Sequence, residues 1–319
     1  MPGLPTLESI LDARRAISGS AIRTPLVRLY ADDDRHGDSR EIYLKLENLQ
    51  PIGSFKIRGA TNAMSRIPPE LLQRGVLTAS AGNMAQGVAW KARDLGISCT
   101  VIAPDHAPLA KLEAVERLGA KTIKVSFEEW WRTFERRSYP GIDGVYIHAF
   151  DDLNVMAGNG TIGLEIVEDL PDVDAVVVPW GGGGLACGIA AAICSLSPEC
   201  KVYAAEVETG APLAASLRAG SPQTIDYRAS FVDGIGSKAV FPDMFDRARA
   251  LIEGSLVASL DEVRSAIRLL AGRNRVIAEG AGACSVACAL AGKAGAGKVV
   301  CIVSGGNIDL TKLCEIIVT

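Results

Sequence analysis

One stretch restricts the fold of this 319-residue chain more than any other. The apolar residues at 175–179 lead into four consecutive glycines, and an apolar, helix-like segment follows at 185–196. A short, continuously apolar strand that turns directly into a helix is typical of a parallel sheet with helices on both faces. The stretch therefore favours an α/β protein.

The same alternation of strand-like and helix-like segments runs through most of the chain. Strand-like runs lie at 42–46, 75–79, 99–103, 122–125, 145–148, 201–205 and 298–303, and helix-like patterns lie at 7–18, 60–64, 84–95, 109–118, 127–139, 161–170, 211–218, 260–271 and 280–291. Thr6 is placed to cap the first helix, residues 32–40 read as a charged loop, and Pro68-Pro69 interrupts the pattern. We therefore predict two open parallel-sheet lobes.

Composition argues against several classes of protein. Hydrophobic residues make up 48% of the chain and charged residues 22%, as in a globular protein with a large core. The net charge is −4 and no basic stripe is present, which argues against nucleic acid as a partner. No apolar run is long enough to span a bilayer, and the first residues lack a signal-like core, so we expect a cytoplasmic protein without membrane contact. Eight scattered cysteines and three histidines predict no metal site.

Lys56 occupies an unusual position for a surface charge. It lies between Phe55 and Ile57, inside a glycine-bounded turn that follows the strand-like run at 42–46. A lysine amine that is partly removed from water has a lowered pKa and forms a Schiff base with an aldehyde cofactor. The alternative is a lysine whose stem covers apolar surface while its amine reaches water. On this stretch alone, the alternative is the stronger interpretation.

The four glycines, Gly181, Gly182, Gly183 and Gly184, are the best candidate for a phosphate site. Backbone without side chains lets N–H groups point at a ligand, and the start of a helix favours an anion. No convincing acidic residue follows at the distance expected for a ribose contact, so a lone phosphate fits better than a dinucleotide. The alternative is a flexible turn without a ligand.

Two further turns follow strand-like runs. Residues 80–84, Ser-Ala-Gly-Asn-Met, lead into a helix, so the N–H groups and the side chains of Ser80 and Asn83 are placed to bind a carboxylate. On this stretch alone, ordinary helix capping by these residues is the stronger interpretation. Ser304 begins a turn after the last strand, at the kind of strand end where ligands bind in open α/β sheets. The alternative is that this turn only ends the strand and binds no ligand.

Together, these four stretches resemble the fold type II pyridoxal-phosphate enzymes, specifically the threonine dehydratase and serine racemase group. The match runs from Lys45 to Asn307, and residues 54–60, Ser-Phe-Lys-Ile-Arg-Gly-Ala, look like the Schiff-base motif of that family. The resemblance implies two open parallel-sheet lobes of the tryptophan synthase beta-like kind, with pyridoxal 5'-phosphate between them. Residues 1–66 and 154–319 would form the large cofactor-binding domain, and residues 67–153 the small domain.

The resemblance also implies roles for individual residues. Lys56 would be the Schiff-base lysine and the catalytic base, Asn83 would bind the phenolic oxygen of the cofactor, and Ser304 would face its pyridine nitrogen. The implied cofactor-binding residues are Phe55, Lys56, Asn83, Gly181, Gly182, Gly183, Gly184, Gly234 and Ser304, and the implied substrate-binding residues are Ser80, Ala81, Gly82, Asn83 and Met84. A neutral serine beside the pyridine nitrogen leaves the ring a weaker electron sink, which suits elimination better than transamination.

The implied activity is that of a lyase. A dehydratase of this group converts an L-3-hydroxy amino acid, such as L-threonine or L-serine, to a 2-oxo acid and ammonia. Ala81 stands where racemases of the group carry a second acid/base serine, which argues against racemisation. Met84 stands where the group usually has histidine, so we expect a more apolar pocket and an aromatic substrate such as L-phenylserine as a candidate.

Alternatives from other classes remain at this stage. They are a racemase or β-replacement enzyme on the same fold, and a non-catalytic small-molecule binder.

Glu206 matches a cation ligand of the racemases, but Pro212 stands at the position of a second carboxylate, so we expect no metal there. The chain stops at Thr319, so we expect no regulatory domain and no feedback inhibition by isoleucine. The expected partner is a small amino-acid substrate, and the resemblance also allows a homodimer.

Overall fold

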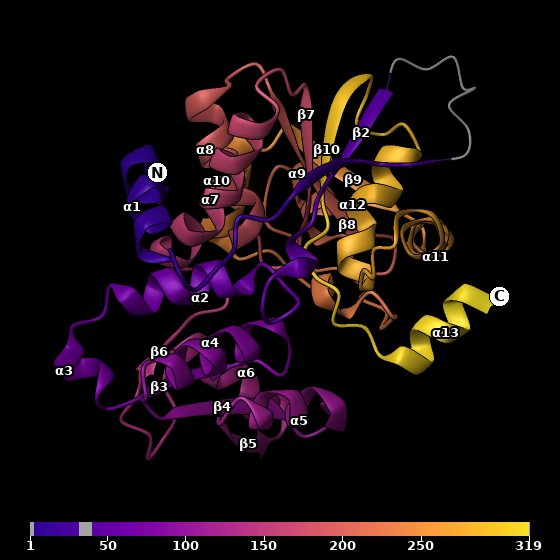
Figure 1. Cartoon of the computed structure of the whole chain (residues 1–319). Helices are drawn as coiled ribbons and strands as arrows, with labels where there is room; N and C mark the ends of the chain where they lie inside the picture. Colours follow the sequence, from indigo (N-terminus) through magenta and orange to yellow (C-terminus); the bar gives the residue numbers. More distant parts are fainter. Residues whose placement is uncertain (1–2, 32–39, 319) are drawn as a thin grey trace.

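A computed structural model describes residues 3–31 and 40–318 of the chain (Figure 1). The strands are β1 Leu26–Arg28, β2 Arg40–Lys45, β3 Val76–Ala79, β4 Cys99–Pro104, β5 Lys121–Val125, β6 Val145–Tyr146, β7 Ala175–Pro179, β8 Lys201–Val207, β9 Gly254–Ala258 and β10 Gly297–Ile302. The α-helices are α1 Leu7–Ala16, α2 Lys56–Ser65, α3 Pro69–Leu72, α4 Asn83–Asp94, α5 Leu109–Arg117, α6 Phe127–Arg136, α7 Leu153–Asp169, α8 Gly184–Leu196, α9 Pro212–Ala219, α10 Pro242–Leu251, α11 Leu260–Leu269, α12 Gly280–Leu290 and α13 Leu310–Val318. Short 3-10 helices cover Glu47–Leu49 (η1) and Asp233–Ile235 (η2), and a π-helical turn covers Leu270–Asn274 (η3).

The larger of the two sheets contains six strands in the order β1-β2-β10-β7-β8-β9. All neighbouring strands are parallel except β1, which pairs antiparallel with β2 at the edge. Helices α7, α8 and α10 pack on one face, and α11 and α12 pack on the other (Figure 1). Strand β7 is buried along its whole length because both of its faces are covered.

The smaller sheet has four parallel strands in the order β5-β4-β3-β6. It lies below the larger sheet in Figure 1, and helix α2 runs between the two. Ala60, Ala63 and Met64 of α2 belong to the core of the smaller sheet, while glycines of α2 and α7 meet on the other side. The predicted α/β class with two parallel sheets is confirmed. We propose the predicted domain boundaries for these sheets, because the strands of the smaller sheet all lie within 67–153 and those of the larger sheet lie outside that range.

Two helices begin earlier than their sequence patterns predict. Helix α2 begins at Lys56 rather than Ala60, and α7 begins at Leu153 because the Asp152 side chain accepts hydrogen bonds from the next N–H groups. Glycines in the first half of α7 lower its helix propensity, so the sequence pattern does not predict that half. Close packing requires these glycines, since a Cβ atom on Gly158 would lie 2.5 Å from the carbonyl oxygen of Arg58.

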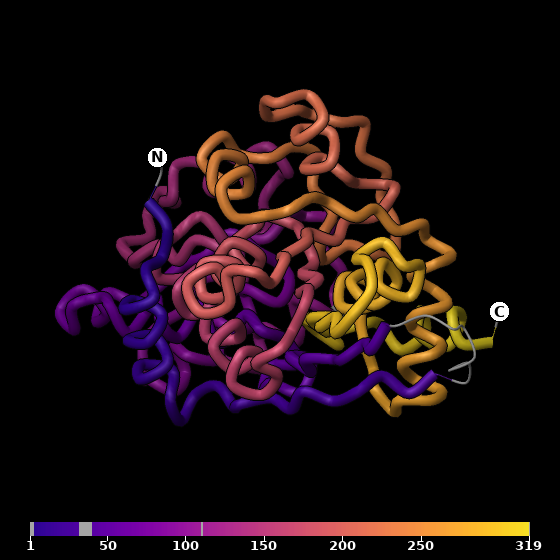
Figure 2. The backbone as a smooth tube through the Cα atoms, turned by 90° about the horizontal axis from the view of Figure 1, so that it is seen from above, coloured from indigo at the N-terminus to yellow at the C-terminus, as the bar shows by residue number. Residues whose placement is uncertain are grey.

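The sequence patterns do not predict β1, β9, α3, α10 or α13. Strands β1 and β9 are short edge strands with partly exposed residues, so they lack the continuous apolar run of a central strand. Most of the predicted loop at 32–40 lies outside the described residues. The two termini lie on opposite sides of the molecule when it is viewed from above (Figure 2).

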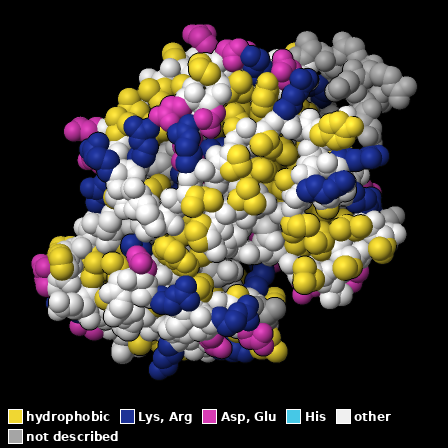
Figure 3. All heavy atoms as spheres, in the orientation of Figure 1, with side chains coloured by type: hydrophobic (Ala, Val, Ile, Leu, Met, Phe, Trp, Pro, Cys, Tyr) yellow, Lys and Arg dark blue, Asp and Glu magenta, His cyan; other side chains and the backbone are white. Residues whose placement is uncertain are grey.

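Acidic and basic side chains are interspersed on the face shown in Figure 3, and they form no continuous stripe of one charge there. Among the described residues, no helix is both long enough and apolar enough to cross a membrane.

A buried ion network fixes the position of α2. The Arg58 guanidinium donates to Glu47 at 2.9 Å and to Glu165 at 2.6 Å, and the Lys45 amine lies 2.6 Å from Glu165. Burial by itself lowers the pKa of Arg58, but the charge of Glu47 and the hydrogen bonds to both carboxylates raise it above its ordinary value. The network therefore holds paired charges inside the protein and ties β2, η1 and α7 to α2.

We predict that Arg58→Met lowers the free energy of unfolding by about 3–5 kcal/mol, because it leaves buried carboxylates without their cation. Urea denaturation followed by circular dichroism measures this change. The matched control is Arg132→Met, because Arg132 lies on the exposed face of α6 with carboxylate partners in its own helix, and its expected change stays within about 1 kcal/mol. Equal losses in both variants would contradict the assigned role of the network.

Candidate active site

The carboxyl ends of strands from both sheets meet at a cleft of about 620 Å³. The segments that follow β3 and β4 approach from the smaller sheet, and those that follow β7 and β10 approach from the larger one. All the site residues expected from the sequence line this cleft: Phe55, Lys56, Ser80, Ala81, Gly82, Asn83, Met84, Gly181, Gly182, Gly183, Gly184, Gly234 and Ser304. The structure thus brings these residues together, and their individual roles stay predictions.

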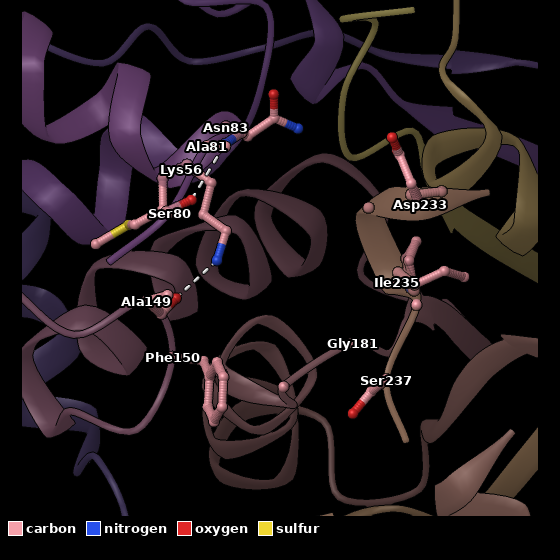
Figure 4. A pocket seen from close by; sticks show the side chains of 18 of the residues that line it. Lys56, Ser80, Ala81, Asn83, Ala149, Phe150, Gly181, Asp233, Ile235 and Ser237 are labelled. Atoms are coloured by element: carbon pink, nitrogen blue, oxygen red, sulfur yellow. Dashed lines mark hydrogen bonds between the residues drawn. The ribbon is translucent and has the colours of Figure 1, made fainter. Parts of the chain in front are cut away.

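Lys56 is the first residue of α2 and directs its amine into the cleft (Figure 4). The amine donates a hydrogen bond of 2.7 Å to the carbonyl oxygen of Ala149. Burial lowers the Lys56 pKa from 10.5 to about 8, although the charge of Glu279 raises it. Lys56 is therefore not an outer-surface lysine, and a substantial fraction of its amine is neutral near pH 8.

Phe55 and Ser304 connect the start of α2 to the end of β10. The Phe55 N–H donates to the Ser304 carbonyl oxygen at 3.0 Å, and Ser54 forms an isolated bridge with Gly305. Ser304 is 3% exposed and borders the cleft. These contacts place a neutral hydroxyl-bearing residue and an aromatic ring beside Lys56.

The glycine loop forms the start of α8. Gly183 precedes the helix with a φ of 90°, and no side chain caps the first N–H groups. A Cβ atom on Gly182 would lie 2.0 Å from the Phe150 ring, and one on Gly184 would lie 2.6 Å from the Phe150 carbonyl oxygen. Side chains are therefore excluded from this loop, and an uncapped helix start of this kind binds anions such as phosphate.

The turn at 80–84 leads into α4 without capping it. Gly82 precedes the helix, no side chain binds its first N–H groups, and the Ser80 hydroxyl instead accepts from the Gly82 N–H at 3.2 Å. The capping interpretation of Ser80 and Asn83 is therefore wrong. These N–H groups have no side-chain partner and border the same cleft, an arrangement that suits a carboxylate.

Asn83 forms a pair of hydrogen bonds that the sequence does not predict. Its amide nitrogen donates to Glu279 at 2.9 Å, and its amide oxygen accepts from Asn307 at 2.7 Å. The side chain lies away from the Lys56 amine in Figure 4. Asn83 thus contacts two protein groups, and a bond to a cofactor oxygen would add to or replace them.

Glu279 is the main site residue that the sequence analysis missed. Burial raises its pKa from 4.5 to about 7, and the negative charge of Asp233 acts in the same direction. A Cβ atom on Gly234 would lie 2.9 Å from the Ala281 Cβ and 3.3 Å from a Glu279 carboxyl oxygen, so that glycine allows close packing against both residues. In the sequence, Glu279 could have been noticed only as a single charged residue directly before the apolar helix predicted at 280–291.

Aromatic residues on the other side of the cleft were also missed. They are Trp130, Trp131, Phe134, Phe150, Tyr227 and Phe241. Their sequence positions are far apart, and the aromatic, charged segment at 127–139 reads as a surface helix.

Glu206 occupies the position of a cation ligand in the racemases, but here its carboxyl group binds backbone N–H groups. Its carboxyl oxygens accept from the N–H groups of Leu213 at 2.9 Å and Ala214 at 2.7 Å, and from the Ser255 hydroxyl at 2.6 Å. Burial raises its pKa despite these hydrogen bonds. Across the described residues, no group of three or more His, Cys, Asp and Glu side chains is placed to hold a metal ion.

Known proteins resemble the chain over nearly its whole length. The family model described as "Pyridoxal-phosphate dependent enzyme" matches residues 17–305. An L-threonine ammonia-lyase from Thermotoga maritima is 42% identical over 315 residues, covering 98% of this chain and 78% of the relative.

Solved structures of similar proteins have the same fold as this chain. Maize serine racemase superposes with a TM-score of 0.91 at 30% identity, covering 98% of this chain and 97% of that one. Threonine deaminase isoform 2 from Solanum lycopersicum gives a TM-score of 0.87 at 32% identity, covering 99% and 91%. The family match includes the segments that carry Lys56, the four glycines and Ser304, so this chain belongs to the pyridoxal-phosphate dependent enzyme family, and its cofactor is pyridoxal phosphate.

Proposed function

We propose that this lyase converts an L-3-hydroxy amino acid to a 2-oxo acid and ammonia by elimination of water, with L-threonine or L-serine as substrate. One observation carries the proposal: the buried Lys56 amine faces a cleft in which Ala81 offers no second acid/base group. The names of the relatives, threonine ammonia-lyase and threonine deaminase, support the same reaction.

The residues of the cleft suit the cofactor. Lys56 would hold its aldehyde, the uncapped start of α8 would hold its phosphate, and Ser304 would leave its ring nitrogen without a charged partner. When bound, pyridoxal phosphate supplies an electron sink that makes the α-proton of an amino acid removable. The fit is one of chemical type: an amine of lowered pKa, an anion site and a neutral hydroxyl group.

The protein side chains then move the proton and orient the substrate. The free N–H groups at the start of α4 bind the substrate carboxylate. The amino group of the substrate first takes the place of Lys56 at the aldehyde, which frees the Lys56 amine. That amine takes the proton from the α-carbon and returns it to the β-hydroxyl group as the Cβ–O bond breaks and water leaves. Hydrolysis of the unsaturated amine that results yields the 2-oxo acid and ammonia. A lowered Lys56 pKa helps because the amine must accept a proton in one step and donate it in the next.

The alternatives fit the cleft less well. Racemisation needs a second acid/base group on the opposite face of the substrate, and the turn at 80–84 presents Ala81, while the Ser80 hydroxyl is bound to the Gly82 N–H. A β-replacement enzyme on this scaffold needs a site for a second nucleophile, and we propose none here. A non-catalytic binder is set aside because the chain is a pyridoxal-phosphate dependent lyase.

Met84 alone does not favour L-phenylserine over L-threonine. Its side chain borders the cleft but is 2% exposed, and it belongs to the core of the smaller sheet together with Ala60 and Val88. The methionine therefore offers little surface to a substrate. Any preference for an aromatic substrate has to rest on other residues.

We also propose a cytoplasmic location and a homodimer. All eight cysteines are free thiols, which supports a reducing compartment. The homodimer rests on the family resemblance alone, and the molar mass in solution from light scattering tests it.

We predict that Lys56→Ala and Lys56→Arg each lower kcat for 2-oxo acid release from L-threonine by at least about 10³-fold, because neither side chain can take the α-proton. The cofactor-loaded wild-type protein is expected to be yellow. Lys111→Ala serves as the control, since Lys111 lines the same cleft but pairs with Asp233, and its expected loss is less than about tenfold. Full activity of Lys56→Ala, or a colourless wild-type protein after cofactor addition, would contradict the proposal.

We predict that the rate at which cofactor-free protein takes up pyridoxal phosphate rises with pH through a midpoint at about 8. Only the neutral amine reacts with an aldehyde, and the neutral fraction grows as the pH passes the lowered Lys56 pKa. Absorbance after rapid mixing measures the rate. In Glu279→Gln the midpoint moves below that of the wild type, because a charge that raises the Lys56 pKa is gone. A midpoint near 10.5, the ordinary value, would show that Lys56 is not desolvated.

We predict that Gly182→Ala weakens pyridoxal phosphate binding by roughly fivefold to a hundredfold, since overpacking of this kind costs about 1–3 kcal/mol. The added methyl group would overlap the Phe150 ring and displace the phosphate loop. Equilibrium dialysis measures the dissociation constant. Gly254→Ala is the control, because nothing lies within 4 Å of a Cβ atom there and its binding should match the wild type. Unchanged affinity in Gly182→Ala would argue against the assigned phosphate site.

A further inference from the structure

Aromatic side chains gather at the cleft. The chain contains 7 Phe, 4 Trp and 6 Tyr residues, and seven of these 17 line the cleft: Phe55, Trp130, Trp131, Phe134, Phe150, Tyr227 and Phe241. The lining residues are a small part of the chain, so this share is far above an even distribution. Such a concentration of rings around a cavity indicates a binding surface.

Five of the rings form one continuous surface, which we call the aryl wall: Trp130, Trp131, Phe134, Phe150 and Phe241. Ring centroids are 5.4 Å apart for Phe134 and Phe150, 5.4 Å for Phe150 and Phe241, and 6.0 Å for Trp131 and Phe241. Helix α6 of the smaller sheet supplies three of the rings, and Phe241 precedes α10 of the larger sheet. The wall is thus built from both sides of the cleft.

The aryl wall begins next to the Lys56 amine. That amine donates to the carbonyl oxygen of Ala149, the residue directly before Phe150 (Figure 4). From Phe150 the rings continue through Phe134 to Trp131, whose 36% exposure places it at the outer end. A substrate with its α-carbon at Lys56 therefore has its β-substituent within reach of the wall.

The aryl wall carries no charge of its own. His148 packs against Phe134 and Phe150, with ring centroids 4.5 Å and 4.9 Å away. Burial lowers the His148 pKa to about 3, so the ring is neutral, and its Nδ1 accepts from the N–H groups of Phe150 and Asp151. An uncharged surface of ring faces and edges suits an aromatic group and disfavours a charged one.

Part of the ring surface of the aryl wall stays accessible to a ligand. Trp131 keeps more than a third of its surface exposed, and the cleft beside it remains open. The Trp130 Nε1–H is buried and has no hydrogen-bond acceptor among the described residues. Buried donors are normally paired, so a bound ligand with an acceptor near this ring would satisfy it.

We infer that the aryl wall is a subsite for an aromatic group on the β-carbon of the substrate, so that 3-aryl-3-hydroxy amino acids such as L-phenylserine are substrates. The inference rests on the proposed function, because that function places the α-carbon of the substrate at Lys56. It assigns the choice of β-substituent to α6 and Phe241 rather than to Met84.

The first test compares Trp131→Ala with Phe127→Ala in the holoenzyme. Phe127 lies in the same helix and stacks on Trp131 at 6.5 Å, but it is not among the residues that line the cleft. The rates of 2-oxo acid release give kcat/KM for L-phenylserine and for L-threonine. In Trp131→Ala we expect the ratio of the two values to fall at least about tenfold, as for a lost apolar pocket contact. In Phe127→Ala the ratio should stay at the wild-type value.

The second test measures binding without turnover. L-phenylalanine and L-2-aminobutyrate lack the β-hydroxyl leaving group, so calorimetric titration of the holoenzyme reports binding alone. Trp131→Ala should weaken L-phenylalanine binding at least about tenfold and affect L-2-aminobutyrate much less. This measurement is independent of the elimination step.

The outcomes separate the subsite from the proposed function. If the wild type releases 2-oxo acid from L-threonine but neither uses L-phenylserine nor binds L-phenylalanine, the subsite is refuted and the proposed function stands. Equal losses on both substrates in Trp131→Ala would also refute it, because the wall would then only hold the two lobes together. If no 2-oxo acid forms from either substrate while Trp131→Ala still selectively weakens L-phenylalanine binding, the proposed function fails and the subsite is supported.

Discussion

The active site depends on the fixed position of helix α2. Arg58 is buried between Glu47 and Glu165, and two residues earlier in the same helix Lys56 begins the first turn. Because the helix is rigid, the ion network that holds Arg58 also sets where the Lys56 amine points. Removing charges from water is costly, so such a network persists only when every charge is paired. Lys56 is thus positioned both by this ion network and by the contacts of Ser54 and Phe55 with the end of β10.

Around that helix, the fold gathers turns from distant parts of the sequence. Parallel strands end at the same edge of a sheet, and here the edges of two sheets face one cleft. The starts of α4 and α8 both border that cleft without a side-chain cap, and we propose that they bind the substrate carboxylate and the cofactor phosphate. The two sites lie on different sheets, so the relative position of the sheets sets the distance between a bound substrate and a bound cofactor.

Burial adjusts the acid–base groups in opposite directions. The same loss of water lowers the pKa of Lys56 to about 8 and raises that of Glu279 to about 7, because desolvation disfavours whichever form is charged. Both groups therefore titrate near neutral pH. For Lys56, the lowered pKa suits the two proton transfers that we propose.

The sequence by itself determined the α/β class, the glycine loop and the family, because these depend on local patterns: apolar strands, turns without side chains and a short motif around Lys56. The family resemblance also pointed to a set of residues that the structure does bring to one cleft, although their individual roles stay predictions. Only the tertiary structure decided the rest. The early start of α2, the position of Glu279 in the cleft and the aryl wall all involve contacts between residues far apart in the chain, such as Phe134 with Phe241 and Asn83 with Glu279. Local sequence carries no signal for such contacts, because burial and pairing are set by the packing of whole elements.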